Sequence, residues 1–343
     1  MRAAVIPRIG APDVFRIEER PVPEPQAGEV LIRVRAAGVN FADVLGRLGL
    51  YPDAPKLPYV PGYEVAGAIE RAAPDVPGFA TGDRVIAITA FNGYSEYVTA
   101  PAWRVFPTPA SLSDTEAAGI PVTYLTAAIA LYKMANVAAG ETVLIHNAGG
   151  GVGIAAAQLA ALRRARLIGT ASAAKHAGLH QFGFEHLIDY RTANVAKDVK
   201  RLTSGRGVDV ILDPLGGASF AESYALLAPL GRLVMFGASN IAPSRTRSLV
   251  TIAKTLWSMP RFKPLSLINR NRGVFGLNAG HLWDARDQLF PIVSMLMQEF
   301  ESGRLKPVIA ATFPLERAAD AHAYLQSRQN VGKVVLTMGG TAL

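Results

Sequence analysis

Four glycines lie within five consecutive positions, at a spacing that could bind a phosphate: Gly149, Gly150, Gly151 and Gly153. The apolar run VLI (143–145) precedes them, and the alanines at 155–157 open a predicted helix that ends near Arg164. A pyrophosphate requires this order, because a loop without side chains exposes backbone amides and a helix N-terminus attracts negative charge. The stretch therefore predicts a dinucleotide-binding loop, with a plain glycine-rich turn as the alternative.

Two registers of the dinucleotide motif fit this loop. In one register, Ala148 replaces the first glycine of the motif. In the other, the three motif positions are Gly151, Gly153 and Ala156. We expect the pyrophosphate to bind the loop residues Ala148, Gly149, Gly150, Gly151, Val152 and Gly153.

The elements after the loop alternate between strand and helix patterns. Strands are expected at residues 166–171, 186–190, 208–213, 232–237 and 274–278, and helices at residues 173–182, 195–203, 218–227 and 285–302. Such repeats imply right-handed crossovers and an α/β fold with a doubly wound parallel sheet, whose ligands bind at the carboxyl ends of the strands. The expected cofactor contacts at these ends are Thr170, Ser172, Lys175, Tyr190, Leu215, Phe236, Gly237, Ala238, Phe275, Gly276 and Leu277.

The end of the second strand distinguishes NADP from NAD. An NAD site usually carries an acid about 20 residues after the glycine motif, where it binds the ribose hydroxyls. Here residues 170–175 read TASAAK, and the first acid is Glu185. Ser172 and Lys175 can bind a 2′-phosphate, so NADP is the expected cofactor. The alternative is that Lys175 is a solvated residue in the first turn of the following helix.

Short β-like runs separated by proline and glycine turns extend from residue 3 to about residue 105, which is typical of a barrel-like β domain. Strands are expected at residues 29–35, 62–69 and 83–88. Residues 40–61 are expected to form a loop-rich connection that carries Asn40, Asp43 and Tyr51. Ser113 and Glu116 predict a helix with a capping box where the chain crosses to the second domain.

The composition limits the classes of protein to consider. The 343 residues carry a formal charge of +8 and predict two domains, residues 1–120 with 305–343 and residues 121–304. The chain has no cysteine, which excludes disulfides and thiolate-bound metals. No apolar run could span a bilayer, and the basic residues are mostly scattered without a nucleic-acid motif. We expect a cytoplasmic protein that binds no nucleic acid and does not insert stably into a membrane.

Several segments together are specific enough to indicate a family. They are NFADVLGRLGLYP (40–52), PGYEVAG (61–67), GDRV (82–85), HNAGGGVG (146–153), TASAAKH (170–176), IDY (188–190), DPLGG (213–217), NRGVFGLNAGHL (271–282) and NVGKVVL (330–336). The chain resembles the zinc-independent quinone oxidoreductases of the medium-chain dehydrogenase/reductase superfamily, and within them the branch of the amine-transport type synaptic vesicle membrane protein. The resemblance covers nearly the whole chain and departs at Gly149, where the family commonly has alanine.

This resemblance implies a GroES-like β-barrel catalytic domain, a Rossmann domain, NADPH as hydride donor and a homodimer. It also implies zinc independence, because Asn40 and its neighbours replace a loop that carries a cysteine in zinc-dependent relatives, and Tyr63 replaces their histidine. We therefore expect no metal-binding residue. Of the six histidines, His146 is expected to be a hydrogen-bonded core or loop-anchoring residue.

Reduction of a quinone or an activated alkene requires a hydride and hydrogen-bond donors to the carbonyl oxygen, where negative charge collects. By resemblance, Asn40 and Tyr51 lie beside the nicotinamide, whereas Tyr63 is a catalytic candidate only through its position, and a packing role is an equal alternative. The product could take its proton from Tyr51 or from water. The resemblance adds the cofactor contacts Thr126, for which Thr123 is an alternative, and Lys333.

The expected function is an NADPH-dependent reductase of quinones or α,β-unsaturated carbonyls, including an enoyl-type variant. The alternative is a cofactor-binding protein with little turnover that associates with a partner or an anionic membrane. Residues 244–272 hold seven basic and no acidic residues, with apolar positions at roughly helical spacing: Leu249, Ile252, Leu256 and Trp257. A competing interpretation makes this segment a cleft wall and subunit contact, since Pro260 and Pro264 interrupt a long helix.

Overall fold

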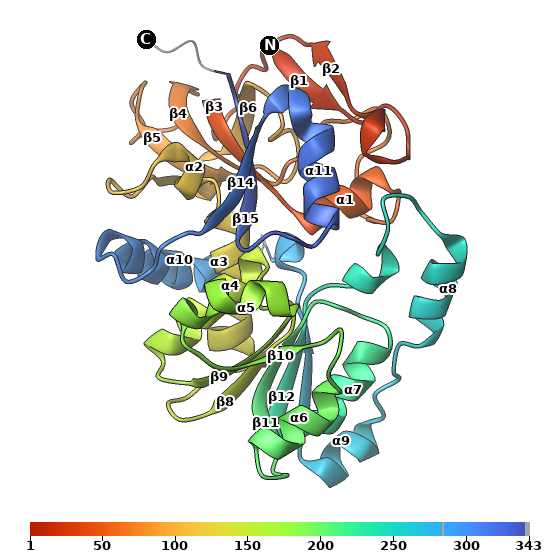
Figure 1. The fold of residues 1–343 in the computed structure, drawn as a ribbon. Coiled ribbons are helices and arrows are strands. Elements are labelled where there is room, and N and C mark those ends of the chain that lie inside the picture. Colours follow the sequence, from red (N-terminus) through yellow and green to blue (C-terminus); the bar gives the residue numbers. More distant parts are fainter. Residues whose placement is uncertain (283–284, 340–343) are drawn as a thin grey trace. The chain divides into compact units, whose positions relative to one another are not determined.

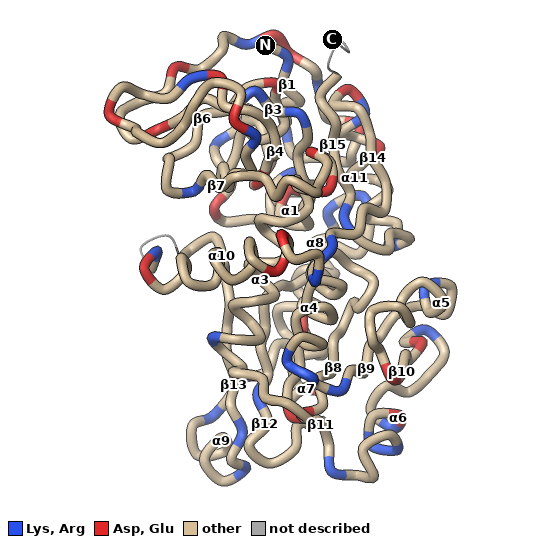
Figure 2. The backbone as a smooth tube through the Cα atoms, turned by 90° about the vertical axis from the view of Figure 1, so that its left-hand side faces the viewer, with Lys and Arg blue, Asp and Glu red and all other residues tan. Residues whose placement is uncertain are grey.

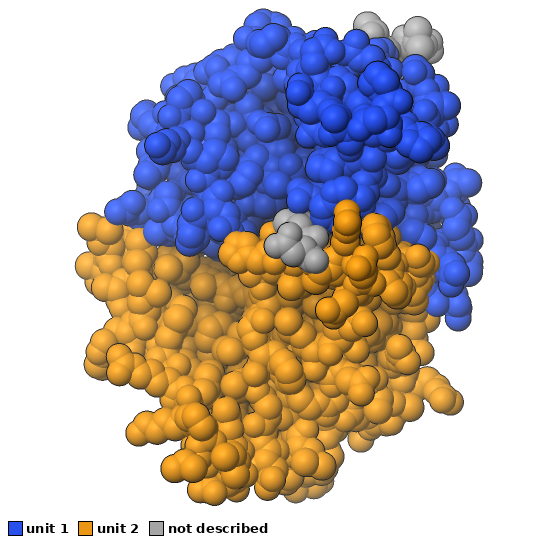
Figure 3. Space-filling model, turned by 180° about the vertical axis from the view of Figure 1, so that it is seen from behind, with its two compact units in different colours: residues 1–122, 244–247, 297–343 blue, residues 123–243, 248–296 orange. Residues whose placement is uncertain are grey.

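The computed structural model describes residues 1–282 and 285–339, and the chain forms two compact units (Figure 3). Unit 1 contains residues 1–122, 244–247 and 297–343, and unit 2 contains residues 123–243 and 248–296. The stretch 244–247 thus belongs to unit 1, although both of its flanks belong to unit 2. The expected division into domains, residues 1–120 with 305–343 and residues 121–304, stays a prediction.

Unit 2 is built on a six-stranded sheet in which all neighbouring strands are parallel (Figure 1). The strands are β8 (Thr142–Ile145), β9 (Arg166–Ala171), β10 (Phe184–Asp189), β11 (Val208–Asp213), β12 (Leu227–Met235) and β13 (Gly273–Gly276). Their spatial order is β10-β9-β8-β11-β12-β13. The chain builds outward from β8 to β10 and then returns to the other side of β8. This order confirms the predicted doubly wound sheet, whose switch point lies between β8 and β11.

Helices connect consecutive strands of this sheet, as the alternating pattern predicts. They are α4 (Gly151–Leu162), α5 (His176–Leu179), α6 (Val195–Leu202) and α7 (Ala218–Leu226). Every residue of β8 and β11 is buried, as expected of central strands in a parallel sheet. In α6, Asn194 caps the helix by accepting the backbone N–H of Lys197 at 2.9 Å, while Val199 is buried.

Several expected elements of unit 2 differ from the structure. Helix α4 begins at Gly151, four residues early, because Gly150 in its extended conformation (φ −75°, ψ 164°) already ends the loop. The expected helix at residues 173–182 is α5 flanked by two 3₁₀ turns, and β10 begins at Phe184. Strand β12 spans residues 227–235, so Phe236 and Gly237 follow the strand instead of ending it.

Unit 1 is built on a seven-stranded sheet with the order β14-β15-β3-β4-β5-β7, and β6 also pairs with β3. The strands are β3 (Glu29–Val39), β4 (Glu64–Ala72), β5 (Arg84–Ile88), β6 (Tyr97–Pro101), β7 (Val105–Pro107), β14 (Ile309–Pro314) and β15 (Lys333–Thr337), with β1 (Arg2–Val5) and β2 (Arg16–Glu19) as a separate pair. The long β3 pairs with β4, β6 and β15. The C-terminal tail therefore completes a sheet that begins near the N-terminus.

Short helices in unit 1 fix the ends of these strands. They are α1 (Phe41–Arg47), α2 (Asp114–Ala117) and α11 (Ala318–Gln326), and α3 (Pro121–Ala128) follows α2. Helix α1 lies in the segment expected to be loop-rich, because Asp43 accepts the backbone N–H of Asn40 at 2.8 Å and so stabilises a helix start. The capping box of α2 is confirmed: Ser113 Oγ accepts the N–H of Glu116 at 3.3 Å, and Glu116 Oε2 accepts that of Ser113 at 3.0 Å.

The segment after β12 contains α8 (Leu249–Trp257) and α9 (Pro264–Arg270), and α10 (Arg286–Glu301) follows β13. Large apolar side chains are exposed on α8 and α9: Leu249, Val250, Leu256, Trp257, Leu265 and Ile268. Figure 2 marks the basic residues around α9 in blue. Among the helices of the described residues, none combines the length and the hydropathy needed to cross a bilayer.

Candidate active site

The glycine loop joins β8 to α4 at the switch point of the unit 2 sheet. The first intrahelical hydrogen bond of α4 runs from Ile154 N to Gly150 O at 3.0 Å. The amides of Gly151, Val152 and Gly153 precede this bond, so they belong to the helix start whose N–H groups have no intrahelical acceptor. These amides suit the pyrophosphate of a dinucleotide.

The loop packs so closely against the start of α4 that a side chain would clash there. A Cβ atom at Gly153 would lie 2.5 Å from Asn147 O and 2.7 Å from Ala148 O, and these backbone atoms cannot move aside cheaply. A Cβ atom at Gly150 would lie 2.7 Å from Asn147 Nδ2. The helix can therefore begin this close to the strand only with glycine at position 153, whereas at position 150 the side chain of Asn147 could move aside, and the close approach leaves the backbone accessible to a ligand.

His146, the first residue after β8, connects the ends of three strands. Its Nδ1 lies 3.1 Å from Thr170 Oγ1 of β9, and its Nε2 lies 3.1 Å from Ser223 Oγ. Ser223 donates its only hydroxyl proton to Asp213 of β11 at 2.7 Å, so it accepts from His146 Nε2–H, and Nδ1 accepts from Thr170. Burial lowers the pKa of His146, and the nearby Asp213 opposes this shift. The expectation of a hydrogen-bonded core histidine is confirmed.

The end of β9 carries the residues expected to select NADP. Thr170 is 2% exposed, Ser172 7% and Lys175 9%. Lys175 lies in a 3₁₀ turn, and its backbone N–H donates to Ser172 O at 2.9 Å. The alternative of a solvated lysine is therefore wrong, because only 9% of Lys175 is exposed.

The other expected cofactor residues follow the same edge of the sheet, because the strands are parallel. Tyr190 is 42% exposed directly after β10. The backbone N–H of Leu277 donates to Met235 O at 2.8 Å, and that of Phe236 donates to Asp213 O at 3.1 Å. These bonds join the ends of β13, β12 and β11. The remaining expected residues of this edge are Leu215, Gly237, Ala238, Phe275 and Gly276. Thr126 belongs to α3, before the sheet begins, and is 8% exposed.

In unit 1, the structure brings Asn40 and Lys333 together around an acid. Glu64 is fully buried, and its Oε1 lies 2.5 Å from the ammonium of Lys333, which is 5% exposed. Asn40 Nδ2 donates to the same Oε1 at 2.8 Å, and Lys333 Nζ donates to Asn40 Oδ1 at 2.6 Å. Glu64 Oε2 accepts the backbone N–H of Val122 at 2.7 Å. The amide of Asn40 is thus held at both of its polar atoms.

A second buried polar chain begins at Asp43. Its carboxylate accepts the N–H of Gly62 at 3.0 Å and the hydroxyl of Tyr94 at 3.2 Å. Tyr94 also contacts His322 Nε2 at 3.3 Å, and Arg47 Nε donates to His322 Nδ1 at 3.3 Å. Burial raises the pKa of Asp43 to about 6 and lowers that of Arg47 to about 10. This chain ties α1 and α11 to each other and to Gly62, which directly precedes Tyr63 and the start of β4 at Glu64.

Tyr51 and Tyr63 lie edge to face, with ring centroids 5.9 Å apart, and Phe91 lies 4.9 Å from Tyr63. Both tyrosines are part-buried, and burial is the main cause that raises the pKa of each hydroxyl. Both hydroxyls therefore stay protonated at neutral pH and can donate hydrogen bonds.

Comparison with known proteins identifies the family of the chain. The family model "Alcohol dehydrogenase GroES-like domain" matches residues 26–110, and the model "Zinc-binding dehydrogenase" matches residues 182–336. The synaptic vesicle membrane protein VAT-1 homolog of Rattus norvegicus is 38% identical over 342 residues, which cover 99% of this chain and 84% of the relative. The chain belongs to the medium-chain dehydrogenase/reductase superfamily.

Other members of the superfamily share both sequence and fold with this chain. The quinone oxidoreductase of R. norvegicus is 32% identical over 98% of each chain. A mycobacterial structure in complex with NADPH has a TM-score of 0.87 and 32% identity, covering 98% of this chain and 100% of that one. The structure of CurK enoyl reductase has a TM-score of 0.84 and 31% identity, covering 98% and 99%. The predicted α/β fold with a GroES-like domain is therefore confirmed.

One matching family model carries the name "Zinc-binding dehydrogenase", and the two segments that the resemblance expects to replace zinc ligands contain no cysteine and no histidine. These two segments are Gly38-Val39-Asn40 and Gly62-Tyr63-Glu64. Within residues 1–282 and 285–339, no three His, Asp or Glu side chains are grouped so that they could hold a metal. Glu64 could offer oxygen atoms, yet both are bonded to protein donors.

Several residues of the unit 1 site were not among the expected site residues, and Glu64 and His322 illustrate why. Glu64 stands in the PGYEVAG segment, and the signal that could have identified it is an acid at the start of an otherwise apolar strand pattern. His322 gave no signal, because it lies on a C-terminal helix whose contact with Tyr94 joins positions 228 residues apart.

Proposed function

We propose that the chain is an NADPH-dependent reductase that transfers hydride to quinones or α,β-unsaturated carbonyls without zinc. The observation that carries the proposal is the glycine loop, whose free helix-start amides lie at the switch point of a six-stranded parallel sheet. When bound there, NADPH would supply the hydride. The NADPH complex of a mycobacterial relative and the quinone oxidoreductase name of another support the assignment.

Preference for NADPH over NADH is proposed from the end of β9. Ser172 and Lys175 offer a hydroxyl and an ammonium to the 2′-phosphate, and residues 170–175 contain no carboxylate, although Asp189 at the end of β10 accepts the backbone N–H of Ala173 in the same turn. A hundredfold preference requires about 2.7 kcal/mol, which one lysine–phosphate contact and the missing acid can supply together. Tyr190, which is exposed at the next strand end, is proposed to pack against the adenosine.

The role proposed for unit 1 is to stabilise negative charge on the substrate. As hydride reaches the substrate, charge collects on its carbonyl oxygen, and a preorganised donor there contributes about 2.7 to 4 kcal/mol. Asn40, Tyr51 and Tyr63 are the proposed donors, since the two hydroxyls stay protonated and the Asn40 amide is fixed by its neighbours. No metal is needed for this chemistry.

The decisive experiment is oxidation of NADPH and NADH by the purified protein, with a panel of ortho- and para-quinones, enones and enals. We expect turnover with NADPH that exceeds turnover with NADH at least tenfold. Substrate preference within the panel separates a quinone reductase from an alkene reductase of the enoyl type. Absence of turnover with every acceptor, despite tight NADPH binding, would contradict the proposal.

A second candidate function is association with an anionic membrane or an acidic partner, with little turnover. The exposed apolar residues of α8 and α9 favour it, because Trp257 is 90% and Val250 80% exposed within a segment that lacks acids. Sedimentation with anionic vesicles at low and moderate salt tests it. Binding that weakens with salt supports this function, and indifference to vesicles removes it.

A cytoplasmic homodimer is the proposed state of the protein. Sedimentation equilibrium would give twice the chain mass of 36.4 kDa for a dimer. Fractionation of cells would place the protein with cytosolic markers or with membranes.

A further inference from the structure

The amide of Asn40 can adopt two orientations that differ by a half-turn, and only one of them presents N–H groups toward Glu64. In the structure, Nδ2 donates to Glu64 Oε1 at 2.8 Å while Oδ1 accepts from Lys333 at 2.6 Å. After a half-turn, the amide oxygen would face a carboxylate and the amide nitrogen would face an ammonium. Both contacts would be repulsive, so the two charges exclude the second orientation.

The charges can impose this choice because both are shielded from water. Glu64 is 0% exposed and Lys333 is 5% exposed, whereas Asn40 is only part-buried. A carboxylate and an ammonium in such a place interact strongly with a neighbouring amide dipole. The unit 1 fold also makes room for the acid: a Cβ atom at Gly38 would lie 2.4 Å from Glu64 Oε1, so this strand position accepts only glycine.

One N–H of Asn40 remains for a ligand. The first N–H is used by Glu64, and the second has only a 3.5 Å contact with Gly38 O, which is a weak hydrogen bond. We propose that the Glu64–Lys333 ion pair is a positioning device that holds the Asn40 amide so that this second N–H donates to the carbonyl oxygen of the substrate. This inference rests on the proposed reductase function, in which Asn40 stabilises the developing charge.

The test is a double-mutant cycle between Glu64 and Asn40, read as kcat and KM separately. We expect Asn40→Ala to lower kcat about 100-fold and Glu64→Gln to lower it at least about tenfold, with KM for the acceptor changed less than threefold. In the double variant, Glu64→Gln should lower kcat no further than Asn40→Ala alone, because Glu64 acts only through the Asn40 amide. Losses that multiply, or a Glu64→Gln variant with unchanged kcat, would overturn the proposal.

Two further variants separate positioning from folding. Glu64→Gln leaves a buried ammonium, so the pair Glu64→Gln with Lys333→Met, which removes both charges, is measured beside it. The variant without both charges should remain folded and show the same loss of kcat as Glu64→Gln alone. Glu70→Gln is the matched control, because Glu70 lies on the same strand β4 and pairs with the exposed Arg33 at 2.9 Å. We expect its kcat to equal that of the unaltered protein.

A second readout does not depend on turnover. In NMR spectra of the protein alone, the two side-chain amide protons of Asn40 should have widely separated chemical shifts, because one is bonded to the buried carboxylate of Glu64 and the other is not, and this separation should shrink once both charges are removed. A separation of the two proton shifts that is the same in the unaltered protein and in the variant without charges would refute the positioning role even if the enzyme is active. Absence of turnover with a fixed amide would instead contradict the proposed function and leave the orientation established.

Discussion

The carboxylate of Asp43 accepts the backbone N–H of Asn40 at 2.8 Å, so a buried acid holds the start of the segment that carries the proposed donor. Asp43 is 2% exposed and also accepts the N–H of Gly62, one residue before Tyr63. One side chain thus positions the backbone of two proposed catalytic residues.

The protonation of Asp43 predicts a pH dependence of stability. Burial raises the pKa of this carboxyl from 3.8 to about 6, while hydrogen bonds from Asn40 and Gly62 oppose the shift. As the pH falls through 6, the folded state binds a proton that the unfolded state does not bind until about 3.8, so acidification favours folding at this site. The stability of the unaltered protein relative to Asp43→Asn should increase by about 2 kcal/mol between pH 7 and pH 4.

Urea denaturation of both proteins at several pH values measures this difference. The comparison cancels the effects of His146 and His322, which both proteins retain. Burial lowers the pKa of both histidines, so their contributions to stability are lost as the pH falls below the usual histidine pKa. A difference between the two proteins that stays constant from pH 7 to pH 4 would show that Asp43 does not titrate in this range.

Reversal of charge at Lys175 should change the choice of cofactor. Lys175→Glu places a carboxylate at the proposed 2′-phosphate site, so we expect kcat/KM with NADPH to fall about 100-fold, equivalent to about 2.7 kcal/mol. The value with NADH should change less than threefold. Lys197→Glu on the exposed side of α6 is the control for net charge. Equal losses with both cofactors would mean that Lys175 supports the fold instead of the phosphate.

Local patterns predicted unit 2 well because its strands and helices repeat in sequence order. Strands β9 and β11 have the predicted bounds, and the glycine loop lies between β8 and α4. Helix α4 starts at Gly151, earlier than predicted. The prediction left its glycines out of the helix because glycine has a low helix propensity. The close packing that requires Gly153 depends on contacts that no local pattern reveals.

The unit 1 site was predicted only in part. Resemblance named Asn40 and Lys333, but their contact joins positions 293 residues apart, and the acid between them comes from a third segment. Periodicity carries no information about such pairings. Lys333 was expected to contact the cofactor, and its ion pair with Glu64 gives it a structural partner that the sequence could not indicate.

Addition of a single methyl group at Gly153 should impair both folding and cofactor binding. In Gly153→Ala, the new Cβ would meet Asn147 O at 2.5 Å and Ala148 O at 2.7 Å. We expect a loss of about 2 kcal/mol in the free energy of unfolding, and NADPH affinity at least tenfold weaker because the loop must shift. Ala161→Ser on the exposed side of the same helix should cost about 0.5 kcal/mol and leave affinity unchanged. A Gly153→Ala variant with normal affinity would refute the close packing of loop and helix.

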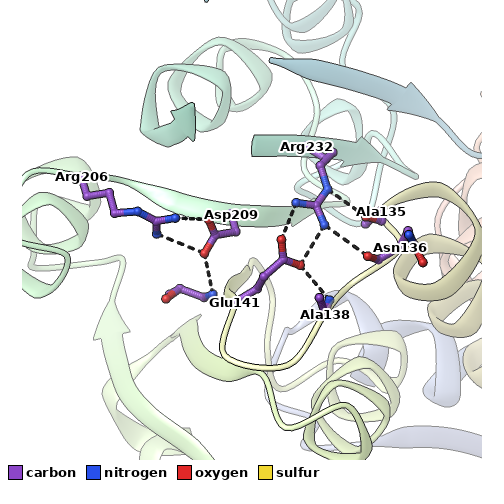
Figure 4. A network of polar contacts seen from close by, with 8 residues as sticks. Ala135, Asn136, Ala138, Glu141, Arg206, Asp209 and Arg232 are labelled. Carbon is purple, nitrogen blue, oxygen red and sulfur yellow. Dashed lines mark hydrogen bonds and ion pairs between the residues drawn. The ribbon is translucent and has the colours of Figure 1, made fainter. Parts of the chain in front are cut away.

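Substitutions near the amino ends of the unit 2 strands, away from the proposed cofactor site at their carboxyl ends, should lower stability without affecting catalysis. Arg232 of β12 donates to both carboxylate oxygens of Glu141, at 2.7 and 2.8 Å, and to Ala135 O at 2.8 Å (Figure 4). Arg232→Met leaves these acceptors without their donor, so we expect a loss of about 2 kcal/mol in urea denaturation with kcat/KM unchanged within twofold. Arg201→Met, which removes an exposed pair with Asp198, should cost at most about 0.5 kcal/mol. Equal losses in both variants would show that the Arg232 network is no more than a surface ion pair.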